Sequence, residues 1–154
     1  MFIPALTKRR LILLAALFTL FAACKVTLLS SYDETTDKVL SEMQQSTTAF
    51  FVKYEVTPSA PELKYGNQSA FYQGLITSSR TLRIRNNAIE KNKPMINMLD
   101  LLDDNIRLMD SLHRGKPDGL LAPHDVRLLK SAFETQYTAM FKFIMALKSR
   151  AGIK

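Results

Sequence analysis

The sequence predicts an all-α protein, an antiparallel up-down four-helix bundle that follows an N-terminal signal peptide. Three observations support this fold class. Glycine is scarce, with 5 residues in a chain of 154, while methionine and leucine are frequent, and this composition favours helices over a β-sandwich. Four segments repeat apolar residues at helical spacing, separated by proline or glycine. The net charge of these segments alternates in sign, and the chain length suits a single domain.

Residues 1–23 have the pattern of an export signal. Lys8, Arg9 and Arg10 form a basic region, and the apolar run LILLAALFTLFAA follows directly. A helix of that length extends about 20 Å, which is short of the ~30 Å hydrocarbon core of a bilayer. We therefore expect a cleaved signal peptide, with an uncleaved membrane anchor as the alternative.

The single cysteine of the chain, Cys24, lies at the end of this apolar run. The sequence Leu20-Phe21-Ala22-Ala23-Cys24 resembles the lipobox of bacterial lipoproteins, in which an aliphatic and two small residues precede a lipidated cysteine. Ala22 and Ala23 match the pattern, whereas Phe21 stands where leucine is usual. The resemblance implies several acyl chains on Cys24, and more than one chain anchors a protein firmly. We expect this covalent lipid and no other cofactor, with a chance cysteine as the alternative.

The residue after the cysteine bears on localisation. It is Lys25, not the aspartate associated with inner-membrane retention in enterobacteria, so we expect an outer-membrane lipoprotein facing the periplasm or the cell surface. A soluble domain secreted to the periplasm is the alternative. Residues 24–31 are then an anchor with a short tether, and residues 32–154 form a single helical domain.

The first two helices are expected over residues 32–54 and 69–91. Ser30 or Ser31 can cap the first helix, and acidic residues occupy its first turn, where the helix dipole favours negative charge. A proline-punctuated loop separates the two helices. The apolar stripe of the second helix is narrow and partly polar, so this helix should depend on its packing partners.

The third and fourth helices are expected over residues 95–113 and 123–149. Pro94 suits the first turn of the third helix, and Gly115 is well placed to end it. The fourth helix carries the longest regular apolar stripe in the chain. Short connections between the last three helices favour antiparallel neighbours.

Charge supports the up-down arrangement. The chain carries 21 basic and 14 acidic residues, a net charge of +7, and three of the basic residues belong to the signal peptide. Residues 25–62, 63–93, 94–113 and 114–154 carry net charges of −3, +5, −3 and +5. In an up-down bundle every helix would lie between two helices of opposite charge, which can bias the topology. A three-helix core with the first helix loosely docked is the structural alternative.

Few side chains are candidates for chemistry. His113 and His124 lie near acidic residues and are weak candidates for a metal site, but their spacing matches no metal-binding motif. A helix-cap or surface role is the main expectation for both. The sequence has no nucleophile motif, phosphate-binding loop or dinucleotide fingerprint, so we expect a protein that is not an enzyme.

Arg80, Arg83 and Arg85 lie in the densest basic patch of the chain. We expect this patch chiefly to form ion pairs with the acidic first and third helices. The alternative is contact with an anionic surface such as lipid headgroups. Because the chain is expected to be exported, we expect no nucleic-acid partner.

Three short stretches of the mature chain occur together: YDETTD at residues 32–37, Leu112-His113-Arg114, and FETQYTA at residues 133–139. Together they resemble a group of small uncharacterised bacterial exported proteins, and this resemblance implies one compact helical domain. The expected function is that of a lipid-anchored envelope protein with a non-enzymatic role in protein–protein interaction or an accessory role. Its expected partners are the membrane and envelope proteins. The alternative is a periplasmic helical bundle that senses a small ligand or a metal.

Overall fold

A computed structural model of the chain describes residues 30–153. The predicted signal peptide, with Lys8, Arg9 and Arg10, and the predicted lipidation site Cys24 lie outside the described residues. Within the described part, no helix is both long enough and apolar enough to cross a membrane.

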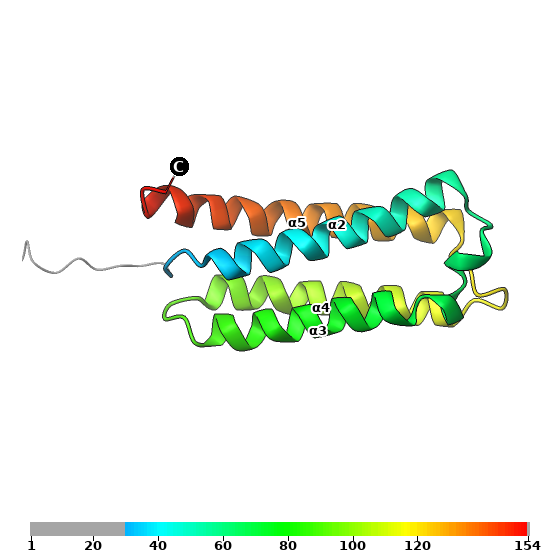
Figure 1. Ribbon diagram of the computed structural model, residues 1–154, viewed down its shortest axis with the longest axis horizontal. Helices are drawn as coiled ribbons and strands as arrows, with labels where there is room; N and C mark the ends of the chain where they lie inside the picture. Colours follow the sequence, from blue (N-terminus) through cyan, green and yellow to red (C-terminus); the bar gives the residue numbers. More distant parts are fainter. Residues whose placement is uncertain (1–29, 154) are drawn as a thin grey trace, which may run out of the picture.

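Four long helices and two short 3-10 turns form the regular structure of residues 30–153. The α-helices pack around the bundle in chain order, each against its sequence neighbour, and the last also packs against the first. Figure 1 shows the chain running alternately back and forth along the long axis. The predicted all-α class and the packing of sequence neighbours are confirmed. The elements are α2 (Glu34–Val56), η1 (Pro61–Leu63), η2 (Tyr65–Asn67), α3 (Ser69–Asn87), α4 (Lys93–Arg114) and α5 (Pro123–Arg150).

The N-terminus of α2 is set by Asp33 and not by the two serines before it. The Asp33 carboxylate accepts a hydrogen bond from the backbone N–H of Thr36 at 2.9 Å, which satisfies one of the free donors of the first turn. Glu34 and Asp37 add negative charge there, as the helix dipole favours. The helix therefore starts two residues later than expected.

The end of α3 is the largest difference from the predicted boundaries, because this helix stops at Asn87 and not at residue 91. Lys91 adopts a left-handed backbone with φ of 58°, which a continuing helix cannot contain. The side chain of Asn92 donates to the Oδ1 atom of Asn86 at 2.7 Å and closes the turn. The local polar contacts of two asparagines thus end the helix before Pro94 is reached.

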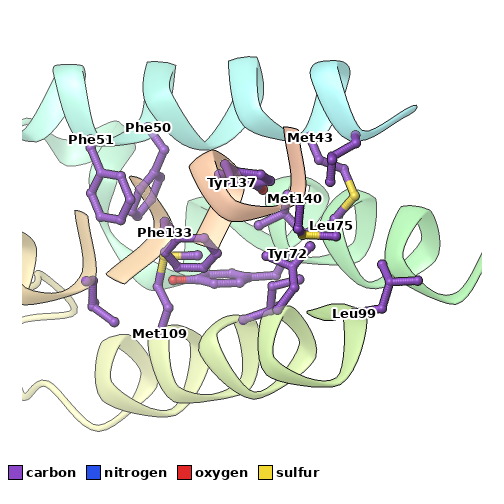
Figure 2. Close-up of a cluster of buried hydrophobic side chains, with 14 of the residues drawn as sticks. Met43, Phe50, Phe51, Tyr72, Leu75, Leu99, Met109, Phe133, Tyr137 and Met140 are labelled. Carbon is purple, nitrogen blue, oxygen red and sulfur yellow. The ribbon is translucent and has the colours of Figure 1, made fainter. Parts of the chain in front are cut away.

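The core fills the space between all four helices. Leu40 of α2, Leu82 of α3, Leu99 of α4 and Met140 of α5 are each fully buried. Figure 2 shows side chains of these helices meeting in the middle of the bundle. Because α2 also buries Phe50, Phe51 and Tyr54, the alternative of a three-helix core with a loosely docked first helix is wrong.

Candidate functional sites

His113 is a buried core residue, so the expected cap or surface role is wrong. Its side chain is 0% exposed at the last turn of α4. The rings of Tyr65 and Phe50 lie against it, with centroid distances of 5.4 and 6.1 Å. A signal for this burial exists in the sequence, because His113 lies four residues after Met109 and continues the apolar stripe of α4.

The hydrogen bonds of His113 define its tautomer. Its Nε2 atom lies 2.8 Å from the carbonyl oxygen of Gly119, which can only accept, so Nε2 carries a proton. The hydroxyl of Tyr72 lies 2.9 Å from Nδ1, which accepts from it when the ring is neutral. The hydroxyl of Tyr54 lies 3.0 Å from Nε2 and donates to the carbonyl oxygen of Leu63 at 3.1 Å. Both ring nitrogens of His113 are therefore hydrogen-bonded.

These bonds join the two loops at one end of the bundle. The carbonyl oxygen of Gly119, in the α4–α5 loop, also accepts from the backbone N–H of Tyr65 at 2.8 Å. The Tyr54 hydroxyl accepts from the backbone N–H of Leu121 at 3.2 Å. Gly119 has φ of +72°, a conformation that favours glycine. The group of Tyr54, Leu63, Tyr65, Tyr72, His113 and Gly119, called here the histidine cluster, ties the α2–α3 connection to the α4–α5 loop.

Burial controls protonation in the histidine cluster. It lowers the pKa of His113, although the carbonyl groups of Gly119 and Leu63 act in the opposite direction. Burial also raises the pKa of Tyr54 and of Tyr72. All three side chains thus stay uncharged near neutral pH and act through hydrogen bonds, which is the arrangement of a structural site.

His124 lies apart from this cluster, exposed in the first turn of α5. Its neighbour Asp125 pairs with Lys116 at 2.5 Å, and this ammonium lowers the pKa of the carboxyl. Residues 30–153 contain no group of three or more His, Cys, Asp or Glu side chains that could hold a metal ion. The structure therefore does not bring His113 and His124 into one ligand set.

The three arginines of the predicted basic patch differ in their partners. Arg83 contacts the carboxylates of Asp100 and Asp103 on α4. Arg85 holds Asp33 through two hydrogen bonds of 2.6 and 2.7 Å and lowers the pKa of that carboxyl to about 2. Two of the three arginines thus join α3 to the acidic helices at its sides. Arg80 is exposed and forms no ion pair with the rest of the described chain.

A groove of about 360 Å³ lies between α2 and α5. Phe51, Phe133 and Tyr137 are buried among its lining residues, and Lys130 lies at its rim, paired with Glu55 at 2.5 Å. An apolar stripe predicts a buried face but not how closely two helices approach each other at the surface. The groove is a candidate site for a small ligand.

A second hollow, of about 650 Å³, lies at the opposite end from the histidine cluster. It is formed by the residues before α2, the turn between α3 and α4, and the end of α5, and Figure 1 shows these segments at one end of the bundle. We call it the terminal pocket. Its lining includes Ser30, Tyr32, Ile89, Lys91, Arg150 and Ile153.

Comparison of the chain with protein-family models, with curated proteins and with solved structures gives no match.

Proposed function

We propose that this chain is a lipid-anchored bacterial envelope protein that acts by binding other envelope proteins and catalyses no reaction. The observation that carries this proposal is the lipobox-like sequence ending at Cys24, ten residues before the start of α2 at Glu34. At about 3.3 Å per extended residue, the tether would hold the bundle within roughly 33 Å of its anchor. The compact helical domain would therefore work at the membrane surface.

The internal chemistry of the bundle supports a binding role over catalysis. Acid-base catalysis requires a titratable group that can reach a substrate. His113 is enclosed, and both of its ring nitrogens already have partners in the histidine cluster. Asp33, Asp100 and Asp103 face arginines of α3. The contacts of these side chains hold the helices of the bundle together.

The intact mass of the mature protein, purified from membranes, tests the anchor. We expect the mass of residues 24–154 plus a diacylglyceryl group and an N-acyl chain. A Cys24→Ser variant should leave the membrane fraction. An unmodified mature mass, or a Cys24→Ser protein that stays firmly in the membrane, would overturn the proposal.

The groove between α2 and α5 supports a second candidate function, the sensing of a small ligand in the periplasm. For the metal form of this function, His124 is the exposed candidate, and His124→Ala should remove any effect of Zn²⁺ or Ni²⁺ on the melting temperature. Replacing His113 would confuse this test, because it also breaks buried hydrogen bonds. If Zn²⁺ or Ni²⁺ raises the melting temperature of the wild type and His124→Ala abolishes this rise, metal sensing would be favoured over the binding of envelope proteins.

A further inference from the structure

We propose that the terminal pocket binds the headgroup of an anionic phospholipid. The bundle would then contact the membrane with the end at which residue 30 lies. This inference rests on the proposed function, because the lipid anchor is what brings this end to the bilayer. It adds a specific surface and a specific class of lipid to that function.

The position of the pocket is the first argument. Ser30, the first described residue, lines the terminal pocket, so the chain outside the structure starts at its wall. The turn between α3 and α4 and the end of α5 lie at the same end of the bundle (Figure 1). An anchor on Cys24, six residues before Ser30, would therefore place this end nearest to the headgroups. The histidine cluster would lie at the far end.

The chemistry of the lining is the second argument. Lys91 and Arg150 bring positive charge from two different elements, and Glu90 is the acidic residue among the lining side chains. Ile89 and Ile153 supply apolar surface beside these charges. A ligand that carries a phosphate next to an apolar portion matches both features.

Two further groups support a negatively charged ligand. The hydroxyl of Ser30 is buried, with a 5% exposed side chain, and has no hydrogen-bond partner among the described residues. Lys148 lies beside the pocket, with its Nζ atom 5.8 Å from the centre of the Tyr32 ring. A phosphate or glycerol oxygen could accept the free Ser30 proton, and Lys148 would add to the positive potential.

The backbone of Lys91 gives an independent indication. Its φ of 58° lies in the left-handed region, where glycine or asparagine would meet the local requirement with less strain. Such strain concentrates at functional sites, where the side chain is needed despite the backbone. A lysine at this position is therefore better explained by its charge than by the turn.

The terminal pocket thus replaces the patch that the sequence suggested for anionic contact. Arg83 and Arg85 are engaged with carboxylates of α4 and of the residue before α2. Arg80 remains exposed on the side of α3, in the middle of the bundle and not at its end. Lys91 and Arg150 lie in the lining of the terminal pocket, at the end that an anchored bundle would turn toward the bilayer.

Vesicle binding tests the inference with a chain that has no anchor. A chain of residues 24–154 with Cys24→Ser keeps every buried side chain of the described core. We compare how much of this protein sediments with phosphatidylcholine vesicles and how much sediments with vesicles that also contain phosphatidylglycerol. The test variant is Lys91→Gln with Arg150→Gln. The matched control, Lys64→Gln with Arg127→Gln, removes the same charge from the opposite end.

We expect binding only to the phosphatidylglycerol vesicles. The test variant should lose about thirtyfold in affinity, from the usual contribution of two basic residues at an anionic surface. The control should bind as the parent does, and circular dichroism should show both variants folded. Equal losses in the two variants, or no preference for phosphatidylglycerol, would overturn the inference.

Three further outcomes separate lipid binding at the terminal pocket from binding of a soluble phosphate and from the lipid anchor. Tighter binding of inorganic phosphate than of phosphatidylglycerol, at an ionic strength matched with chloride, would indicate a soluble phosphate ligand and would overturn the lipid assignment. A lipidated mature mass together with no vesicle binding would refute the inference and leave the proposed function standing. Vesicle binding by a protein that carries no lipid in cells would refute the anchor alone.

Discussion

Acidification should destabilise the bundle through His113. Burial holds the pKa of His113 below the ordinary value of 6.5, so the unfolded chain takes up a proton before the folded chain does. The contribution of the neutral side chain to the free energy of unfolding is therefore complete above about pH 6.5. It is lost as the pH falls from there toward the pKa of the folded state.

The contacts of His113 give the origin of this loss, and the unfolded pKa sets its upper limit. A proton on Nδ1 would meet the Tyr72 hydroxyl, which now donates to that atom and is buried with 4% exposure. Asp110 and Asp118 favour the charged form, but burial outweighs them. Each pH unit below the unfolded pKa is worth up to about 1.4 kcal/mol. Between about pH 7.5 and about pH 5.5 the loss is therefore at most about 1.4 kcal/mol, or roughly 5 °C in melting temperature.

Urea unfolding followed by circular dichroism, at three pH values across this interval, measures the effect. His113→Gln should be less stable at neutral pH by about 1–3 kcal/mol, because the bonds of a buried hydroxyl and a buried carbonyl are disturbed. The free energy of unfolding of His113→Gln should fall little further on acidification. His124→Gln, which changes an exposed histidine, should keep the pH dependence of the parent. An equal loss on acidification in His113→Gln and in the wild type would refute the reasoning.

Further substitutions have expected outcomes in the same unfolding assay. Gly119→Ala should destabilise the protein by about 1–2 kcal/mol, because residue 119 has a φ of +72°. Gly74→Ala should stabilise it by about 0.5–1 kcal/mol, because residue 74 lies in open space on α3. A more stable Gly119→Ala than Gly74→Ala would contradict this reasoning. Asp33→Asn should cost about 1 kcal/mol near neutral pH, since the half-exposed Arg85 partner is screened by water. That difference should disappear as the pH falls from about 4 to about 2, and a constant difference would count against the ion pair. Lys91→Gly should weaken vesicle binding and should be about 1 kcal/mol more stable than Lys91→Ala, because both variants lack the lysine side chain and only glycine adopts a φ of 58° without strain. Equal stability of the two variants would show that the left-handed φ carries no strain.

Much of the fold follows from periodicity and charge in the sequence. The stripe of the last helix, from Val126 to Leu147, is buried as its spacing indicates. The alternating charges correspond to contacts such as Arg83 with Asp103 and Lys130 with Glu55, each between helices of opposite charge. These features are local or averaged over a whole helix, so they can be recognised without the tertiary structure.

The histidine cluster could not be predicted in the same way. Its bonds join His113 to Tyr54 and Gly119, and Tyr54 lies 59 positions away in the chain. Nothing in the spacing of these residues indicates that they meet. The terminal pocket is similar, because Ser30, Lys91 and Arg150 come together only when the ends of three elements are placed in space. The early end of α3 was missed because side-chain bonds between Asn86 and Asn92 override helical propensity.

The terminal pocket has one more consequence, which concerns chain connectivity. Ser30 and Ile153 both line it, so the two ends of the described chain lie side by side. Domains with neighbouring ends tolerate circular permutation. A short linker across the pocket, with new ends opened in the turn between α3 and α4, would leave the histidine cluster at the opposite end untouched. The order in which the four helices are translated is thus separable from the way in which they pack.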